Sequence, residues 1–244
     1  MKEWITGKNP VHETLIAARR QCFRLLIADQ LQPDKRIQQM EQLAAKRKIP
    51  VERAPRSRLN NLGENTQGIG LEVGGYPYAD LAEILVNARK KNEAPFILIL
   101  DTLQNPQNFA TLIRSAEAFG VHGILLPFRH TVGVTPAVVT ASAGASEHMS
   151  IAMLNLAQAI AGLQQQGIWI LGLEGSPDAA PLEQVKLTGG LAIVVGSEGE
   201  GMRSLIRKSC DQVVRLSMTG RTESLNAAVA GSIALYLAQQ QRQK

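Results

Sequence analysis

Three polar segments, each following a run of apolar residues, carry the side chains of this chain that are best suited to chemistry. The first, DTLQNPQNFATLIRSAEAFG at 101–120, contains Asn108 and Arg114. The second is GSEGEGM at 196–202, and the third covers 216–237. Amide, guanidinium and carboxylate groups on loops can position a ligand and its protons, so these segments form the candidate site.

The composition of the second segment restricts what it can bind. Its three glycines permit positive φ angles and a close approach of a ligand to the backbone. Their spacing is GxxGxG, which differs from the dinucleotide GxGxxG, and no P-loop lysine follows. The segment also lacks the GxSxG pattern of hydrolases. Two glutamates disfavour a phosphate cradle and suit a neutral or partly cationic ligand. A tight turn is the structural alternative, but three glycines together favour a binding loop.

The first and third segments also permit purely structural interpretations. Asn108 is placed to cap the helix after Pro106, and Arg114 could simply pair with Glu117 at i+3. Ser224 could be only the N-cap of the last helix. That helix is rich in alanine and glycine, which permits close packing against backbone or against a second subunit, although an ordinary interior helix remains the alternative.

The elements that must position these segments alternate between strands and helices. Strands are predicted at 96–100, 123–127, 168–173, 191–196 and 212–216, because continuous apolar runs are typical of strands buried on both faces. Helices are predicted at 109–119, 136–146, 154–166, 202–210 and 224–240. This alternation indicates an α/β fold with a mostly parallel sheet covered on both faces. Ligands bind outside the carboxyl ends of such strands, where the three segments lie.

The N-terminal part is predicted to be a separate small α/β domain. Helices are expected at 11–19 and 35–48, strands at 23–28, 50–54 and 69–73, and a turn-rich stretch at 57–65. GGYPY at 74–78 indicates a boundary, and a linking helix is expected at 80–92. The expected organisation is therefore a substrate-binding domain at 1–75, a linker at 76–94 and a second domain at 95–244.

The charge of the chain is concentrated in that N-terminal part. Residues 1–91 hold 16 Lys and Arg against 10 Asp and Glu, whereas the rest holds 10 against 11. A one-sided basic excess fits binding of a polyanion such as RNA, and a solvated basic surface fits equally well. The candidate RNA-binding residues are Lys46, Arg47, Lys48, Arg53, Arg56 and Arg58. Aromatic residues make up only 4% of the chain, which argues against an RRM-type stacking platform.

Composition excludes several other classes of protein. Hydrophobic residues make up 45% of the chain and charged residues 19%, which is ordinary globular usage. Only two cysteines occur, so a disulfide scaffold and a cysteine zinc site are excluded. The four histidines show no metal-ligand spacing, and no metal is expected. No apolar run approaches the roughly 20 residues that span a bilayer, and the first residues lack a secretory apolar region. A cytoplasmic location is expected.

Taken together, the three segments resemble the three motifs of the SPOUT superfamily, in its SpoU/TrmH family of RNA ribose 2′-O-methyltransferases. GSEGEGM and SLN stand at the family's distance behind an NPxN…R block, and VHGILLP and ASAGASEH also match. WITGKNPVHETL and NTQGIGLEV resemble the family's substrate-binding domain. The resemblance covers nearly the whole chain and is greatest to bacterial enzymes that methylate a guanosine ribose in 23S rRNA.

The resemblance implies a deep trefoil knot in the C-terminal sheet, a rare exception to the usual connection rules. It also implies S-adenosylmethionine as the cofactor and a homodimer formed through the knotted domain. Carried over by position, the cofactor-binding residues are Leu173, Gly175, Val195, Gly196, Glu198, Gly201, Leu216, Met218, Ser224 and Leu225.

The catalytic residues implied by the resemblance are Asn108, Arg114, Glu198, Ser224 and Asn226. Arg114 is the residue that the resemblance implicates in activating the 2′-hydroxyl. A free arginine is a poor base because it is essentially always protonated, so the substrate phosphate would have to take the proton or the complex would have to perturb the guanidinium. The other four would position substrate, loop and cofactor.

The sequence departs from the family's pattern at four places. Alanine stands at 110 where glycine is usual, serine at 217 where proline is usual, and Ala-Ala at 227–228 in place of Val-Ser. Thr66 stands where a histidine is frequent. None of these removes a proposed catalytic side chain, but they weaken assignment to one nucleotide. A non-catalytic RNA-binding or ribosome-assembly protein, an antibiotic-resistance rRNA methyltransferase and a tRNA methyltransferase remain alternatives.

Overall fold

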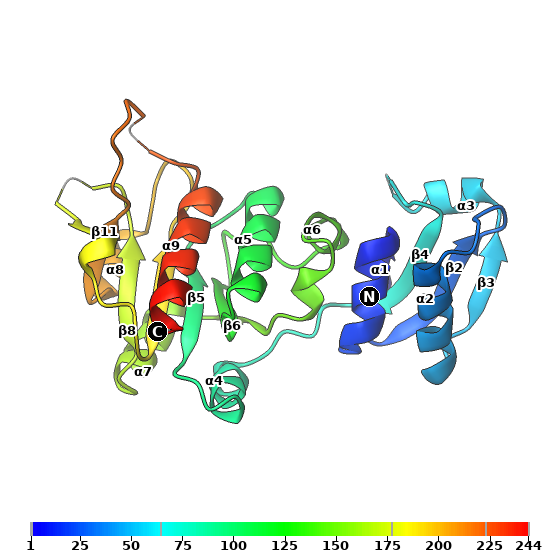
Figure 1. Cartoon of the computed structure of the whole chain (residues 1–244), viewed down its shortest axis with the longest axis horizontal. Helices are drawn as coiled ribbons and strands as arrows, with labels where there is room; N and C mark the ends of the chain where they lie inside the picture. Colours follow the sequence, from blue (N-terminus) through cyan, green and yellow to red (C-terminus); the bar gives the residue numbers. More distant parts are fainter. Residues whose placement is uncertain (1, 64, 177, 223, 244) are drawn as a thin grey trace. The chain divides into compact units, whose positions relative to one another are not determined.

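The computed structural model describes residues 2–63, 65–176, 178–222 and 224–243. Two compact units are distinguished (Figure 1). The first contains the residues up to Pro77 together with Gly133–His148. The second contains Tyr78–Val132 and Met149–Lys244. A segment from the middle of the sequence therefore completes the N-terminal unit.

The first unit is built on a four-stranded sheet in the order β1-β4-β2-β3. Its strands are β1 (Lys2–Thr6), β2 (Cys22–Ala28), β3 (Val51–Ala54) and β4 (Ile69–Gly74), and only β2 and β3 pair in parallel. Helices α1 (Lys8–Ala17) and α2 (Lys35–Lys46) were expected. Strand β1 was not predicted. Helix α3 (Arg56–Asn60) occupies the first part of the stretch 57–65 that was expected to be turn-rich.

The inserted segment of the first unit is tied to it by a buried ion pair. It contains α6 (Pro136–Ala141) and the 3-10 helix η1 (Ala145–Glu147), so the helix expected at 136–146 ends early. The Arg20 guanidinium donates from Nε and Nη2 to the two carboxylate oxygens of Glu147 at 2.9 and 3.0 Å. Both residues are buried, and Arg20 also pairs with Glu3. Burial is the larger influence on Glu147 and raises the pKa of its carboxyl, against the lowering effect of Arg20.

The second unit contains a seven-stranded parallel sheet in the order β7-β6-β5-β10-β8-β11-β9. The strands are β5 (Phe96–Leu100), β6 (Gly123–Pro127), β7 (Ile151–Leu154), β8 (Trp169–Leu173), β9 (Ala180–Pro181), β10 (Leu191–Val195) and β11 (Gln212–Arg215). The predicted parallel sheet is thus confirmed. Strands β7 and β9 were not predicted.

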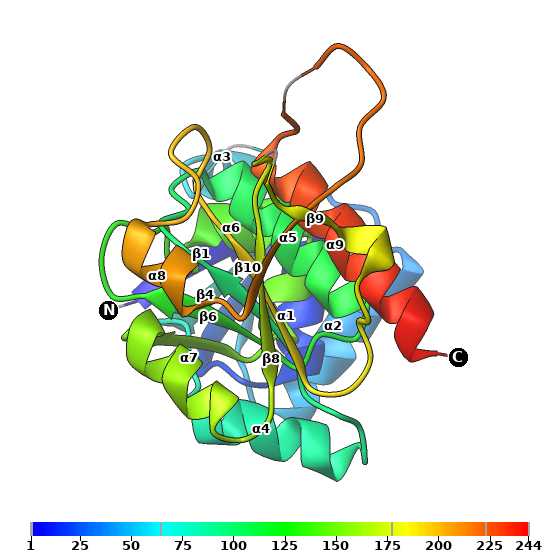
Figure 2. The same ribbon diagram turned by 90° about the vertical axis from the view of Figure 1, so that its left-hand side faces the viewer.

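Helices cover both faces of this sheet, as predicted (Figure 2). One face carries α5 (Pro106–Ala118) and α9 (Ala227–Arg242). The other carries α4 (Leu81–Lys90), α7 (Leu156–Gln164) and α8 (Ser204–Ser209), whose apolar side chains form one core with those of the sheet. The 3-10 helix η2 (Leu182–Gln184) precedes β10. None of the helices in the described part of the chain combines the length and apolar character needed to cross a membrane.

The strand order brings together chain segments that are distant in sequence. β10 lies between β5 and β8, and β11 lies on the other side of β8. After β11 the chain returns to α9, which packs against α5. The carboxyl ends of β5, β8 and β10 and the segment before α9 therefore meet at one edge of the sheet. The trefoil knot implied for this region stays a prediction.

Candidate functional site

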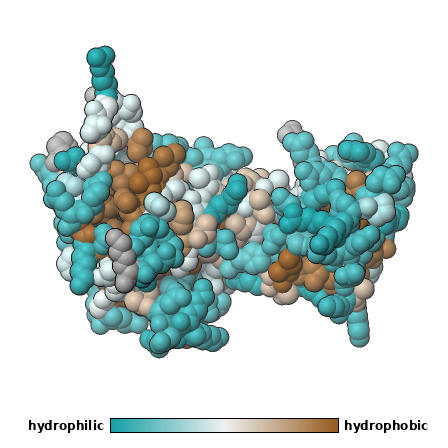
Figure 3. Space-filling model, viewed as in Figure 1, coloured by the Kyte–Doolittle hydropathy of each residue, from teal (hydrophilic) through white to brown (hydrophobic). Residues whose placement is uncertain are grey.

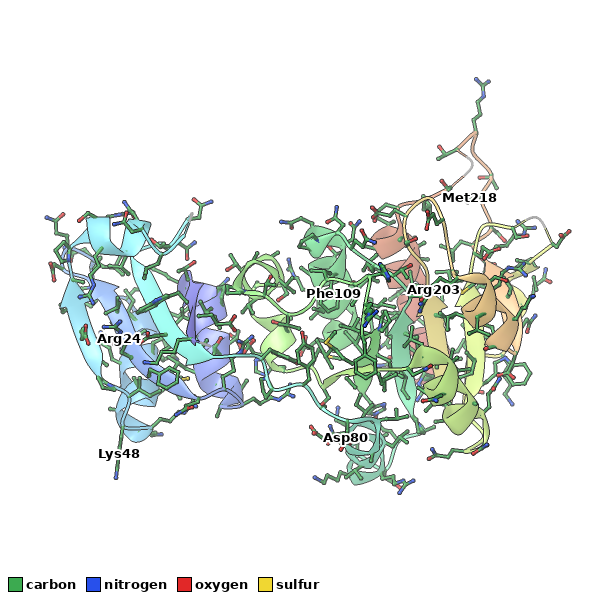
Figure 4. The ribbon with its side chains drawn as sticks, turned by 180° about the vertical axis from the view of Figure 1, so that it is seen from behind. Arg24, Lys48, Asp80, Phe109, Arg203 and Met218 are labelled. Carbon is green, nitrogen blue, oxygen red and sulfur yellow. The ribbon has the colours of Figure 1, made fainter. Side chains whose placement is uncertain are left out.

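A cavity of about 560 Å³ lies at this edge of the second unit. The ends of β8 and β10, the glycine loop 196–202 and the segment 216–225 before α9 contribute to its lining. Met218, labelled in Figure 4, lies on the segment before α9, and the labelled Arg203 follows the glycine loop directly. All ten residues predicted to bind the cofactor line it: Leu173, Gly175, Val195, Gly196, Glu198, Gly201, Leu216, Met218, Ser224 and Leu225.

The glycine loop folds back on itself so tightly that one glycine cannot be replaced without movement. The backbone N–H of Ser197 donates to the Gly201 carbonyl, and that of Gly201 donates to the Ser197 carbonyl, at 3.0 and 3.1 Å. A Cβ at Gly196 would lie 2.2 Å from the carbonyl carbon of Gly201. Gly199 and Gly201 have φ angles of 89° and 69°, which glycine adopts without strain. The glycines therefore fix the loop's shape.

A buried carboxylate anchors the end of this loop. Asp101, directly after β5, is fully buried. It accepts hydrogen bonds from the backbone N–H and the Nε of Arg203, both at 2.8 Å, and its Oδ1 lies 2.6 Å from Nη2. Arg203 is the residue between the loop and α8. No motif in the sequence indicates this pair, whose only local signal is an aspartate that ends an apolar strand.

Three of the predicted catalytic residues lie together beside the cavity. The Asn226 side-chain amide donates to Glu198 Oε1 at 2.9 Å and to Asn108 Oδ1 at 3.3 Å. These residues come from the start of α9, the glycine loop and the first turn of α5. The second and third segments thus meet the first, although Asn108 and Asn226 are 118 residues apart. We call Asn108, Glu198 and Asn226 the amide–carboxylate cluster.

The structure corrects two of the predicted helix caps. Asn105, not Asn108, is the N-cap of α5, since its side chain accepts from the backbone N–H of residues 107 and 108. Pro106 occupies the first helical position, where proline is favoured. Asn226, not Ser224, is the N-cap of α9. Ser224 lies two residues earlier, exposed on the cavity lining.

Arg114 lies on the exposed side of α5. The structural alternative, an ion pair with Glu117, is not formed among the described residues. Its charge is therefore available to a ligand. Among the described residues, Arg114 forms no hydrogen bond with a member of the amide–carboxylate cluster.

The electrostatic character of the cavity is acidic. Glu174, Glu198 and Glu200 line it, and Arg207 pairs with Glu174 at 3.0 Å between Nε and Oε1. The remaining two carboxylates favour a ligand with positive charge.

The thiol of Cys210 is not a candidate nucleophile. It packs against β8, with Sγ about 3.0 Å from where a Cβ on Gly172 would stand. Burial raises the pKa of its thiol to about 12, so it stays protonated at neutral pH and is no nucleophile.

A second, more polar cavity of about 530 Å³ adjoins the first. It shares Ser197, Glu198 and Glu200 with the first cavity. The rest of its lining comes from residues 102–105, His130 and Arg203. The glycine loop thus contributes to both cavities, of which the second has the more polar lining, and this arrangement suits two ligands that meet beside the loop.

The six candidate RNA-binding residues lie in the first unit around β3. Three of them, Lys46, Lys48 and Arg56, are exposed and form no ion pair within the described ranges. The side chain of Lys48 points away from its unit in Figure 4. Arg53 pairs with Glu41 at 2.6 Å, and Arg58 lies 3.7 Å from Glu52.

Arg47 differs from the other five. It is half-buried, and its guanidinium donates to the carbonyls of Leu15 and Arg20 at 3.2 and 3.0 Å. It therefore has a structural role inside the first unit, which the basic character of its sequence neighbourhood did not reveal.

Two family models match the chain, and together they cover most of its length. Residues 95–236 match the model of the SpoU rRNA methylase family, and residues 4–79 match an RNA 2′-O ribose methyltransferase substrate-binding domain. YacO of Bacillus subtilis, named as a TrmH family tRNA/rRNA methyltransferase, is 39% identical over 240 residues, covering 96% of this chain and 94% of that protein. A similarly named protein of Staphylococcus aureus is 35% identical over 95% of this chain and 93% of its own length.

Solved structures show the same fold. The SpoU methyltransferase AviRb from Streptomyces viridochromogenes, in complex with AdoMet, superposes with a TM-score of 0.81 at 23% identity, covering 98% of this chain and 90% of that one. An AdoMet-bound rRNA methyltransferase from Sinorhizobium meliloti gives 0.81 at 19% identity, with 98% and 87% coverage. These likenesses confirm the predicted SPOUT fold. On the family match and the sequence identity over nearly its whole length, the chain belongs to the SpoU/TrmH family of RNA methyltransferases.

Proposed function

We propose that this chain transfers the methyl group of S-adenosylmethionine to a ribose 2′-hydroxyl of RNA in the cytoplasm, and that its target is a guanosine of 23S rRNA. One observation carries the proposal. Residues from all three motif segments converge beside a single cavity, where Asn226 hydrogen-bonds both Asn108 and Glu198.

The residues of the first cavity fit this cofactor. Leu173, Leu216 and Leu225 offer apolar surface for a nucleoside. Glu198 and Glu200 suit the positive charge of a sulfonium and an amino group. The glycine loop lets the backbone approach closely. The cofactor supplies an activated methyl group, so the protein must chiefly align the acceptor and manage one proton.

The chain's own groups divide this task between them. The amide–carboxylate cluster holds the glycine loop against α5 and α9 and so fixes the boundary between the two cavities. Arg114, exposed and unpaired among the described residues, binds the substrate phosphate beside the reacting ribose. Because a guanidinium is always protonated, the phosphate accepts the proton of the 2′-hydroxyl, and Arg114 stabilises the charge that develops.

Substitution of Arg114 tests that role. Arg114→Ala should lower methyl transfer by about 100-fold or more, the usual scale for losing an electrostatic stabiliser, and leave cofactor affinity unchanged. Arg89→Ala is the matched control, since Arg89 is an exposed arginine on α4, which covers the face of the sheet opposite to α5. Wild-type turnover of Arg114→Ala would remove this residue from the mechanism.

A homodimer formed through the second unit is part of the proposal. Val229, Ile233 and Tyr236 follow one another on one side of α9 and are 39–48% exposed. Figure 3 shows an apolar patch over this helix. The Tyr236 ring lies 5.6 Å from that of Phe119, which extends the face toward the end of α5. Exposed apolar faces of this kind are typical of protein interfaces.

Sedimentation analysis tests the dimer. Ile233→Asp should shift the protein toward monomer. Val86→Asp is the control, because Val86 on α4 is 39% exposed, as is Ile233. Equal sedimentation of Ile233→Asp and wild type would place the interface elsewhere.

The activity itself is tested by tritium transfer from labelled S-adenosylmethionine to 23S rRNA, naked and in ribosomal particles, followed by fragment mapping. Label on one guanosine ribose supports the proposal in full. Label on tRNA or on another rRNA nucleotide corrects the target. Cofactor binding without transfer to any RNA would refute RNA methylation, and absence of cofactor binding would favour a non-catalytic RNA-binding protein.

A further inference from the structure

Phe128 has the most exposed large apolar side chain among the residues that the structure describes, at 67%. It lies in the loop 128–130, which follows β6 at the carboxyl edge of the catalytic sheet. Its neighbours Arg129 and His130 are exposed as well. An aromatic ring presented to solvent beside a cation is the arrangement on which nucleic-acid bases stack.

The loop 128–130 is continuous with the proposed active site. His130 lines the polar cavity that contains Glu198. Phe128 and Arg129 line a further cavity of about 370 Å³, formed with the start of α7 and with α8. Arg203 lines both cavities. A strand with one nucleotide in the polar cavity would therefore have its neighbour at Phe128.

The charges differ between these two cavities in a way that fits an RNA strand. The cavity at Phe128 is lined by Arg129 and by Arg203, whose guanidinium is paired with Asp101, and by no acidic residue. Arg129 makes no ion pair within the described ranges, so its charge is available to a phosphate. The polar cavity also contains Glu198 and Glu200, the carboxylates assigned above to the cofactor, so the positive charge that suits a phosphate lies on the side of Phe128.

We propose that the loop 128–130 is an RNA-binding site of the catalytic unit, where Phe128 stacks on the base next to the methylated nucleotide and Arg129 binds its phosphate. This inference rests on the proposed function and adds a contact outside the N-terminal basic residues. The occupant is single-stranded RNA, because stacking requires a base that is free of its duplex partners.

Substitutions at Phe128 separate stacking from simple apolar contact. Phe128→Leu keeps an apolar side chain but removes the ring, whereas Phe128→Trp keeps a stacking surface. Naked 23S rRNA is the probe, with affinity measured by filter binding and methyl transfer by tritium incorporation. Phe128→Leu should weaken RNA affinity and raise KM by about tenfold, the scale of one lost base–aromatic stack, while kcat and cofactor affinity stay at wild-type values. Phe128→Trp should keep the RNA affinity and the KM of wild type.

Arg129→Ala should weaken binding and reduce the slope of log affinity against log salt by about 0.7, the contribution of one single-strand phosphate. Arg89→Ala, on the remote α4, should change neither quantity.

The outcomes keep the two proposals apart. If wild type methylates RNA and Phe128→Leu has wild-type affinity and KM, the stacking site is refuted and the methyltransferase proposal stands. If Phe128→Leu instead alters sedimentation and leaves RNA affinity unchanged, the ring belongs to a protein interface and the inference fails. If wild type binds cofactor but transfers methyl to no RNA, the proposed function itself fails.

Discussion

Replacing Asp101 by asparagine should loosen the glycine loop while changing no residue of the cavity itself. Asp101 is fully buried and receives three contacts of 2.6–2.8 Å from Arg203. An asparagine oxygen can retain part of this set, but its NH₂ group would face N–H donors. The substitution therefore removes a negative charge and places the asparagine NH₂ group against the N–H donors of Arg203, at the point where the loop enters α8.

The expected cost follows from these contacts. A hydrogen bond to a charged group contributes about 1.5–3 kcal/mol, and two of the three should be lost. The Arg203 side chain is 48% exposed, so water can solvate the abandoned guanidinium and reduce the loss. We expect a net destabilisation of about 3 kcal/mol, which for a chain of this size lowers Tm by roughly 6–12 °C. Cofactor affinity should fall about tenfold if only a tenth of the molecules keep the loop in place.

Thermal unfolding and isothermal titration with S-adenosylmethionine measure the two effects. The control is Glu41→Gln, which removes a carboxylate from Arg53 at 2.6 Å, as short as the contact at Asp101. That pair is exposed, so its loss should cost no more than about 0.5–1 kcal/mol. If Asp101→Asn has the Tm and cofactor affinity of wild type, or if the two variants are destabilised equally, burial is not what makes this anchor strong and the reasoning fails.

Three further predictions concern other parts of the chain. Gly196→Ala should abolish cofactor binding because its Cβ would lie 2.2 Å from backbone, whereas Gly220→Ala, with no atom within 4 Å, should bind normally in the same titration. Gly162→Ala, inside α7 with open space around it, should raise stability by about 0.5–1 kcal/mol in denaturant unfolding; a loss of stability would contradict this. Burial opposes ionisation of Glu13, but hydrogen bonds from His12 and His148 outweigh it and lower its pKa below 4.5. Its ionised form therefore contributes stability above pH 4.5 that is lost as pH falls through the lowered pKa. Below pH 4.5, the free energy of unfolding of Glu13→Gln should therefore fall less steeply with decreasing pH than that of wild type.

The interior of the catalytic sheet could be predicted from sequence because its strands are buried on both faces. β5, β6, β8 and β10 appear as uninterrupted apolar runs, and the predicted bounds agree within one residue. Edge strands lack that signal. β1 has the sequence KEWIT and β7 only four residues, and both are the outermost strands of their sheets.

The sequence predicts residues that the structure brings to one cavity, but it does not predict the contacts that hold them there. Resemblance placed Glu198 and Asn226 in the site, and local chemistry could have identified Asn105 as the cap because Pro106 follows it. The pairing of Asp101 with Arg203 joins residues 102 apart, and no local pattern encodes it. Contacts between residues far apart in sequence fix the positions of Asp101 and Arg203, whereas local hydrophobic periodicity predicts the helices and the inner strands.

The completion of the first unit by Gly133–His148 has a consequence for synthesis on the ribosome. Chain growth of about 5–20 residues per second leaves roughly 4–14 seconds between the appearance of Pro77 and that of His148. During that interval Arg20 has no Glu147 to pair with, and Tyr76 cannot donate to the Ser146 carbonyl. The N-terminal unit is therefore expected to reach its final form only after β5, α5 and β6 have been made, so that the order of folding does not follow the order of translation.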